Sequence, residues 1–282
     1  MKTRSQIQIL IACVAGFIVG SAHAVEWQDL VNDTGPDGWQ QMGGSARYEF
    51  QDGEIVGYAV PDSPNSFLTT KKEYADFILE YEARLDDPMN SGVQFRSHVR
   101  DNGVVYGYQV EIDPTPRRFT GGLYDEKRRR WMYPLTLNEK GRDAFRNGDW
   151  NHFRVEAIGN SLRVWVNGIQ TVDMVDDMTA KGFIGLQVHS IRDPEHAGRS
   201  VRWRNMRILT SDLDANRKPR DPDVVQISYQ HNQLTEYEVR NGWRLLWDGK
   251  TSAGWRGAKL DHFPKSGWTM KDGVLTVEAT DG

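Results

Sequence analysis

Cysteine is almost missing from this sequence, since Cys13 is the only one among 282 residues. A single thiol can form neither an internal disulfide nor a zinc site built from several thiolates. Stability must therefore come from a packed core. An excess of positive charge is missing as well, because the formal net charge is −4. A net-acidic chain is poorly suited to binding a polyanion, so we expect no nucleic-acid partner.

One basic run departs from this composition. Lys127 to Arg130 are all basic, and Arg117 and Arg118 lie a few positions upstream. Short clusters of Lys and Arg are typical of phosphate-binding patches. This run lies in a net-acidic chain, however, and we interpret it as a solvated turn.

Long apolar runs are also missing. The stretch from Ile7 to Gly20 is shorter than the roughly 20 apolar residues of a membrane-spanning helix. Lys2 and Arg4 precede it and Ala22-His23-Ala24 follows it, which is the order of an export signal. We therefore expect residues 1–24 to be a signal peptide, cleaved after Ala24, with the mature bacterial protein periplasmic or secreted and without a membrane span.

Cleavage would remove Lys2, Arg4 and Cys13, and would lower the formal net charge from −4 to −6. A second interpretation stays open for the same segment. Leu10 to Cys13 also fits a short lipoprotein signal, in which the cysteine becomes lipidated. Lipoprotein anchoring is thus the alternative to a soluble exported chain.

The sequence repeats itself over a long interval. The tryptophans that bound Trp27–Trp39 recur at the ends of Trp243–Trp255, and both are shifted by 216 positions. The segment Asp52–Val56 recurs as Asp272–Thr276, shifted by 220. Self-similarity on this scale indicates a duplicated domain. A sandwich domain needs about 100 residues or more, so we expect residues 242–282 to be the start of a second, truncated copy.

Residues 211–241 separate the two copies. The part from Ser211 to Asp223 is rich in Asp, Arg, Lys and Pro and has no apolar period, which is typical of a linker. Thr235 to Glu238 has the spacing of a capping box, and Gly242 follows as a helix stop. We expect a linker that ends in one short helix.

Residues 25–210 show a period of two. Phe77–Arg84, Phe153–Ala157 and Leu162–Val166 each alternate apolar and polar side chains. Asn167-Gly168 follows the last of these as a hairpin turn. No segment has a convincing helical period. Many short alternating strands predict an all-β domain of two stacked antiparallel sheets.

Three strands of this domain share an unusual polar face. Residues 92–96, 108–113 and 184–189 direct Val, Phe, Tyr, Ile and Leu to the core. Because side chains alternate along a strand, the opposite face collects Gln94, Arg96, Gln109, Glu111, Asp113, Gln187 and His189. A half-exposed sheet normally has a polar outer face. This one is rich in side chains that form directional hydrogen bonds, so a binding face and an ordinary solvated face both stay open.

Aromatic residues flank the glycine-rich and arginine-rich loop after the acidic strand. They are Tyr124, Trp131 and Tyr133. Their rings could stack on a sugar while the polar face binds its hydroxyl groups. Packing in the sandwich core is the alternative for each ring.

Several segments resemble a known family, the 3-keto-disaccharide hydrolase domain, whose fold is similar to that of concanavalin A-like lectins and glucanases. The matching segments lie in order over about residues 26–209. They are Asn90–Arg96, Gly107–Ile112, Thr120–Tyr124, Gly148–Asn151, Val166–Gly168, Gly185–His189 and Trp203–Asn205. The resemblance implies a two-sheet antiparallel jelly-roll sandwich and a carbohydrate substrate. One departure is that the family commonly has Glu-x-Gln where this chain has Gln109-Val110-Glu111.

The resemblance also implies a reaction, the cleavage of glycosides already oxidised to a ketone at C3. On this hypothesis Glu111 or His189 removes the C2 hydrogen and Arg96 stabilises the enolate. The remaining candidates bind substrate: Gln94, Gln109, Asp113, Tyr124, Trp131 and Gln187. No cofactor is established by the sequence, although a divalent metal would suit an enolisation.

Three functions stay open at this point. They are an exported enzyme that cleaves 3-keto-glycosides, a non-catalytic carbohydrate-binding module, and an adhesive envelope domain whose duplication serves multivalency. The sequence does not distinguish the sugar, its linkage or the oligomeric state.

Overall fold

The computed structural model describes residues 26–86 and 89–279. The predicted signal peptide, including Cys13, lies outside these residues, so cleavage and localisation stay predictions. Among the described residues, no helix is long and apolar enough to cross a membrane.

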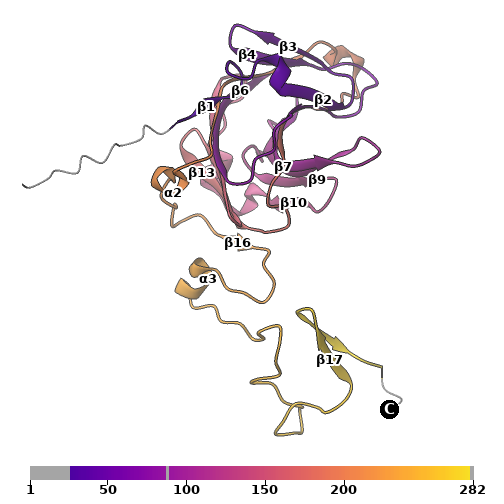
Figure 1. Ribbon diagram of the computed structural model, residues 1–282, viewed down its shortest axis with the longest axis vertical. Helices are drawn as coiled ribbons and strands as arrows, with labels where there is room; N and C mark the ends of the chain where they lie inside the picture. The colour runs from indigo at the N-terminus through magenta and orange to yellow at the C-terminus, as the bar shows by residue number, and fades with distance from the viewer. Residues whose placement is uncertain (1–25, 87–88, 280–282) are drawn as a thin grey trace, which may run out of the picture.

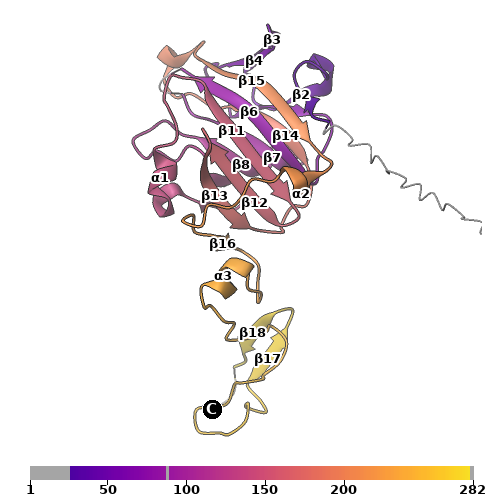
Figure 2. The same cartoon turned by 90° about the vertical axis from the view of Figure 1, so that its left-hand side faces the viewer.

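Two β-sheets pack face to face in the first domain (Figures 1 and 2). The nine-stranded sheet has the order β16-β13-β12-β11-β6-β15-β4-β3, with β1 paired to β15. The strands of this sheet are β1 (Gln28–Asp29), β3 (Arg47–Gln51), β4 (Glu54–Tyr58), β6 (Phe77–Leu85), β11 (Asn151–Ile158), β12 (Ser161–Val166), β13 (Ile169–Val175), β15 (Ser200–Leu209) and β16 (Ile227–Ser228).

The seven-stranded sheet has the order β10-β9-β8-β7-β14-β5-β2. Its strands are β2 (Trp39–Gly43), β5 (Ser66–Thr70), β7 (Ser91–Val99), β8 (Val105–Ile112), β9 (Leu123–Glu126), β10 (Arg130–Tyr133) and β14 (Phe183–Val188). The remaining elements are short: η1 (Pro36–Gly38), η2 (Leu135–Leu137), η3 (Pro194–His196), α1 (Glu139–Arg142), α2 (Leu213–Asn216), α3 (Glu236–Arg240), β17 (Trp268–Lys271) and β18 (Val274–Val277).

The predicted all-β jelly-roll sandwich is confirmed. The alternating segments form β6, β11 and β12, and these pair antiparallel in the nine-stranded sheet. Asn167 and Gly168 join β12 to β13 with φ of 49° and 83°. Positive φ at both central residues is the geometry that an Asn-Gly hairpin turn favours.

The core lies between the two sheets, where the alternation placed it. Val93, Tyr108 and Leu186 from the seven-stranded sheet belong to one buried cluster with side chains of the other sheet. Tyr81 and Phe153 stack there with ring centroids 5.0 Å apart. The opposite face of β7, β8 and β14 is consequently the face on which the predicted polar set must lie.

The first part of the predicted linker, residues 211–229, docks on the sandwich, and we call it the strap. Lys218 N donates to Glu156 at 2.8 Å, Arg220 pairs with Asp173, and β16 adds to β13 as a parallel strand. Val224 is buried in the sandwich core. The strap is polar because its charged and polar groups contact buried carboxylates of the nine-stranded sheet. Composition alone does not tell such a docked segment from one whose charges face solvent.

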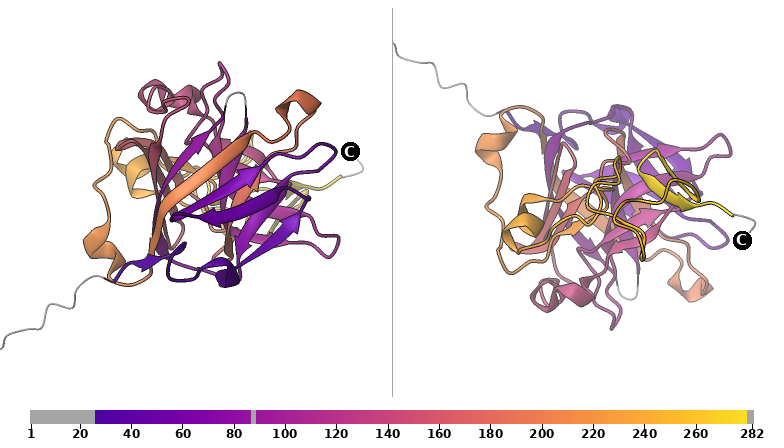
Figure 3. Two further views of the ribbon diagram at one scale, coloured as in Figure 1. Left: turned by 90° about the horizontal axis from the view of Figure 1, so that it is seen from above. Right: turned by 90° about the horizontal axis from the view of Figure 1, so that it is seen from below.

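The short helix predicted from the capping box is present as α3. Thr235 and Glu238 exchange both hydrogen bonds of the capping box. The C-terminal segment beyond α3 lies below the sandwich in Figures 1 and 2, and in front of it when viewed from below (Figure 3).

A local structure recurs in the two predicted copies. Trp39 Nε1 donates to the carbonyl of Leu30 at 3.0 Å, and Trp255 Nε1 donates to the carbonyl of Leu246 at 2.6 Å. The hairpin β17–β18 turns at Asp272-Gly273 as β3–β4 turns at Asp52-Gly53, with positive φ at both positions in each. These likenesses support the duplication, and the domain boundaries themselves stay predictions.

Candidate functional site

A polar cavity of about 290 Å³ opens on the outer face of the seven-stranded sheet. It brings together six of the residues predicted for the site, from four elements of the fold. Its lining consists of Asn65, Asn90, Gln109, Glu111, Arg117, Tyr124, Glu126, Lys127, Trp131, Gln187 and His189. We call it the polar cavity below.

Strand register sets these side chains in rows. Gln109 on β8 lies opposite Tyr124 on β9, and Tyr124 lies opposite Trp131 on β10. Two residues further along β8, Glu111 lies opposite Gly92 on β7. Gly92 in turn lies opposite Gln187 on β14. Aromatic rings thus stand on one side of the cavity and the carboxylate and amides on the other.

Gly92 leaves room for the amide of Gln109. A Cβ atom placed on Gly92 would lie 2.4 Å from Cδ of Gln109, well inside contact distance. The amide group therefore occupies the space above the glycine, between Glu111 and Gln187. Gln109 Nε2 donates to Oε2 of Glu111 at 2.8 Å, and its contact with Oε1 of Gln187 is 3.4 Å long.

A chain of hydrogen bonds with one direction leads to Glu111. Ser97 Oγ donates to Oε1 of Gln94 at 2.6 Å, and Gln94 Nε2 donates to Oε1 of Gln109 at 2.8 Å. Gln109 then donates to Glu111, whose other oxygen accepts from Asn90 Nδ2 at 2.9 Å. These contacts hold the Glu111 carboxylate in one orientation because both oxygens have a donor.

The Glu111 carboxyl group has an unusual acidity. Burial raises its pKa to about 7, since the side chain is cut off from water and the residue is only 7 % exposed. The bonds from Asn90 and Gln109 lower the pKa, and the charges of Asp113 and Glu126 raise it further. A carboxyl group with a pKa near neutrality can both accept and return a proton at physiological pH.

His189 and Glu126 are two further ionisable residues of the cavity. His189 Nδ1 lies 2.8 Å from the carbonyl of Ser190. A carbonyl only accepts, so Nδ1 carries the proton and Nε2 is left as the exchangeable nitrogen. Burial raises the pKa of Glu126, while the charges of Lys127 and His189 lower it. Lys127 Nζ lies 3.7 Å from Oε1 of Glu126.

Two aromatic rings and a guanidinium form the opposite wall. The rings of Tyr124 and Trp131 meet edge to face at 5.3 Å. The Arg117 guanidinium lies 5.2 Å from the Trp131 ring and is held by Asp113 at 2.8 Å. Tyr133, by contrast, is buried in the core and donates its hydroxyl to the carbonyl of Val225.

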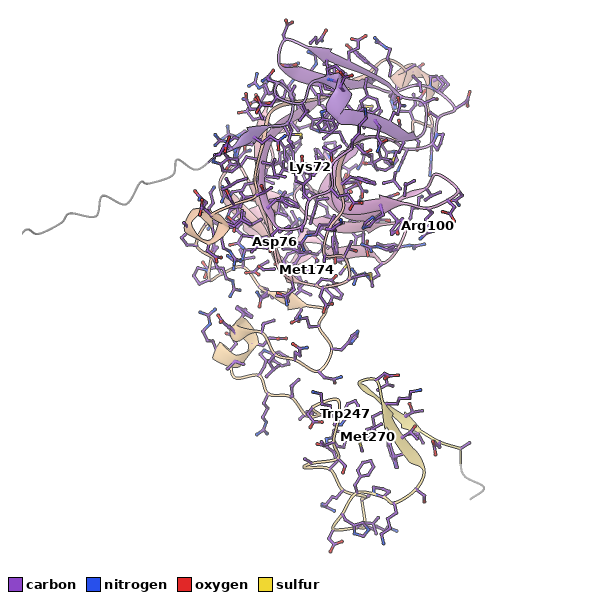
Figure 4. The ribbon with its side chains drawn as sticks, in the orientation of Figure 1. Lys72, Asp76, Arg100, Met174, Trp247 and Met270 are labelled. Carbon is purple, nitrogen blue, oxygen red and sulfur yellow. The ribbon has the colours of Figure 1, made fainter. Side chains whose placement is uncertain are left out.

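The structure contradicts the placement of Arg96 on the polar face. Residues 96 and 97 form a bulge opposite Gly107, and Arg96 has φ of 45°. The bulge breaks the alternation, so the guanidinium points through the sandwich to the carbonyls of Ala75, Ala157 and Gly159. It also pairs with Asp76 at 2.8 Å, which Figure 4 shows well apart from Arg100 at the β7–β8 hairpin.

Two further predicted substrate contacts have other roles. Gln94 is fully buried beneath Gln109 and orients that amide. Asp113 is buried as well, and its carboxylate holds Arg117 instead of facing the cavity. Both residues position neighbours that line the cavity.

Five lining residues were missing from the sequence prediction: Asn65, Asn90, Arg117, Glu126 and Lys127. Glu126 lies two positions after Tyr124 on β9, so the same alternation would have found it. Asn65 comes from the loop before β5 and reaches the cavity only through the fold. The basic run forms the predicted turn, but Arg128 and Arg129 pair with the buried Asp125 instead of facing solvent.

A metal centre is not apparent in the part of the chain that the structure describes. No group of three or more His, Cys, Asp or Glu side chains there could hold an ion. The cavity residues therefore do not fit the divalent metal that an enolisation could use, and no step below is routed through one.

Gly92→Ala should disturb the cavity while keeping the sandwich. The added methyl displaces the Gln109 amide, so Glu111 loses one of its two donors and its pKa rises further. We expect the catalytic rate to fall about tenfold and the free energy of unfolding to fall by about 1 to 3 kcal/mol. Gly148→Ala, outside both cavity linings, serves as the control: its positive φ of 75° makes the alanine costly in thermal denaturation, but nothing lies within 4 Å of the added methyl, so turnover should be kept. An unchanged rate for Gly92→Ala would contradict this role of Gln109.

Comparison with known proteins identifies the sandwich. Residues 26–209 match the model of a family described as the 3-keto-alpha-glucoside-1,2-lyase-like domain. This confirms the resemblance found in the sequence. No curated protein sequence matches the chain.

Three solved structures have similar folds at low identity. A candidate glycosyl hydrolase from Parabacteroides distasonis is 17 % identical, with 62 % of this chain and 89 % of that chain covered and a TM-score of 0.46. A carbohydrate-binding module from Bacillus subtilis is 15 % identical, with 61 % and 95 % covered and a TM-score of 0.43. A Bacillus subtilis protein with a galectin-like fold is 12 % identical, with 66 % and 95 % covered and a TM-score of 0.49.

Proposed function

Because this chain belongs to the 3-keto-alpha-glucoside-1,2-lyase-like domain family, we propose that its polar cavity cleaves glycosides that carry a ketone at C3. A role in carbohydrate chemistry follows from the family, and the specific reaction is our proposal. The observation that carries it is the buried Glu111 carboxyl group, oriented by two donors and with a pKa of about 7. On the signal predicted at residues 1–24, we place the reaction in the periplasm or outside the cell.

The ketone makes this cleavage possible without a pair of flanking carboxylates. A base takes the proton from C2, and the electron pair of the C–H bond forms an enolate with the C3 oxygen. The enolate then forms a C1–C2 double bond, and the C1–O bond breaks with its electrons on the leaving oxygen, which takes a proton. Addition of water across C1 and C2, with the hydroxyl at C1 and the proton at C2, gives a net hydrolysis.

Glu111 is the base in this proposal. At a pH near its pKa of about 7, a substantial fraction of the carboxyl group is ionised, and the protonated product form is equally accessible. Gln109 and Asn90 fix its orientation, and the Glu111 side chain lines the cavity. Gln187 and Tyr124 lie beside it as partners for sugar hydroxyls.

Besides the base, the reaction needs an acid for the leaving oxygen and a positive charge beside the enolate. Residues on the cavity wall supply both in this proposal. His189 with a proton on Nε2 can donate it to the leaving oxygen. Arg117 or Lys127 supplies positive charge for the enolate, because Arg96, which the sequence predicts for this role, does not line the cavity. Arg117 is the more rigid of the two, since Asp113 and Trp131 hold it.

The proposal predicts turnover of a 3-keto-glucoside with an acid limb near pH 7. Glu111 must be deprotonated to act as base, so the rate falls as pH decreases through the pKa of about 7. The measurement is release of the aglycone from 4-nitrophenyl 3-keto-glucoside between pH 4 and 9, with and without a chelator. The unoxidised glucoside is the control substrate. Binding of unoxidised glycans with no turnover of either compound would favour a non-catalytic module.

A further inference from the structure

A second cavity, of about 480 Å³, adjoins the polar cavity. The two share four lining residues: Asn65, Glu126, Lys127 and His189. We call the second one the side cavity. Its lining includes Asn102 to Val105, which places it at the hairpin between β7 and β8; Figure 4 labels Arg100 of this hairpin.

The side cavity has a different chemical character from the polar cavity. Phe67, Val104, Val105 and Pro64 contribute carbon surface to its wall. Phe67 and Val105 are buried in a small cluster with Phe183, separate from the main core. A cluster of this kind makes a firm apolar floor for the side cavity, unlike the carboxylate and amides of the polar cavity.

The charges of the side cavity compensate each other. Lys127 and Glu126 both line it and lie 3.7 Å apart, so their sum is close to zero. Apart from His189 at the boundary with the polar cavity, the remaining polar side chains of the wall, including Asn102 and Ser190, are neutral. An uncharged apolar group would therefore enter without separating the Lys127–Glu126 pair, whereas a carboxylate or a phosphate would compete with Glu126 for Lys127.

His189 stands on the boundary between the two cavities. If a sugar ring occupies the polar cavity, the bond from C1 to the leaving oxygen must cross this boundary to reach the side cavity. At this boundary His189 can act as the acid for the leaving oxygen. The C1 substituent then lies in the side cavity. The layout thus gives each half of a glycoside its own compartment.

We propose that the side cavity binds the leaving group of the glycoside, and that this group is an uncharged apolar alkyl or aryl moiety. This inference rests on the proposed function. A second hexose is disfavoured because those of its hydroxyl groups that face Phe67, Val104 and Val105 would have no hydrogen-bond partners. The substrate class is accordingly alkyl or aryl 3-keto-glucosides in preference to 3-keto-disaccharides.

The test compares methyl and hexyl 3-keto-glucosides, whose leaving alcohols have similar acidity and differ in apolar length. For the wild type we expect kcat/KM to be about tenfold or more higher for the hexyl compound. Val104→Asp puts a charge into the side cavity and should remove most of this preference, because kcat/KM falls much more for the hexyl compound than for the methyl compound. Val99→Asp on the same hairpin, at an exposed position outside the cavity lining, is the matched control and should keep the preference.

The two hypotheses fail in different ways. Equal kcat/KM for both compounds in the wild type, or equal losses for both in Val104→Asp, would overturn the leaving-group assignment and leave the proposed function intact. No release of either alcohol by the wild type would overturn the proposed function, and this inference with it.

Discussion

Glu111→Gln should abolish turnover of a 3-keto-glucoside and leave the sandwich folded. We expect a loss of about 10²- to 10⁴-fold, the range typical of removing a general base. Glutamine has the same shape and cannot take the proton from C2. The rate is measured by aglycone release, and the fold by circular dichroism and thermal denaturation. Glu82→Gln, on the outer face of the other sheet, is the control and should keep full turnover.

The same variant should change how stability depends on pH. The folded-state pKa of about 7 lies above the ordinary value of 4.5, so ionising Glu111 disfavours the folded protein. The wild type therefore loses stability as pH rises from about 4.5 to about 7, by about 3 kcal/mol. Glu111→Gln lacks this loss, so its unfolding free energy relative to wild type should increase between pH 4 and pH 8. A variant that follows the wild type at every pH and still turns over substrate would remove Glu111 from the mechanism.

Arg96→Met should destabilise the protein and spare its catalytic rate. The Arg96 guanidinium is 1 % exposed and serves three carbonyls and Asp76. Without it the carbonyls of Ala75, Ala157 and Gly159 lose the bonds from the guanidinium, and Asp76 keeps only its bond from Gly159 N. We expect the unfolding free energy to fall by about 3 to 5 kcal/mol, as for other broken buried charge contacts.

Urea denaturation measures that change, and turnover is measured on the folded fraction at low temperature. Arg47→Met on β3 is the control, since Arg47 is an exposed arginine paired with an exposed glutamate and should change stability by less than about 0.5 kcal/mol. A large loss of kcat for Arg96→Met with little change in stability would restore Arg96 to the active site.

Alternation along the strands predicted most of the cavity. Gln109, Glu111 and Gln187 lie where a period of two placed them, because β8 and β14 run without irregularity through those positions. The family resemblance located the same strands. The fold class followed from the same pattern, since short alternating strands with Asn-Gly turns admit few architectures.

The misplaced residues have identifiable causes. Arg96 has a positive φ at a bulge, and neither bulge residue is a glycine or proline that would indicate an irregularity. The alternating pattern alone therefore could not show that the Arg96 side chain points to the core side of the sheet. Asp113 follows the expected direction, but Arg117 four positions later captures its carboxylate. The strap of residues 211–229 is charged because it meets buried acids, and those partners come from strands distant in the sequence.

The strap also decides what can happen at the border of the nine-stranded sheet. β13 would otherwise present a free row of backbone groups to any passing chain. β16 pairs with its last residues, and Asn138 donates to the carbonyls of Gln170 and Thr171 at its start. Arg220 and Gln226 of the strap each donate a hydrogen bond to one carboxylate oxygen of Asp173. A second molecule is thereby denied a template for intermolecular strand addition along β13, which protects a protein rich in β-structure against aggregation at high concentration.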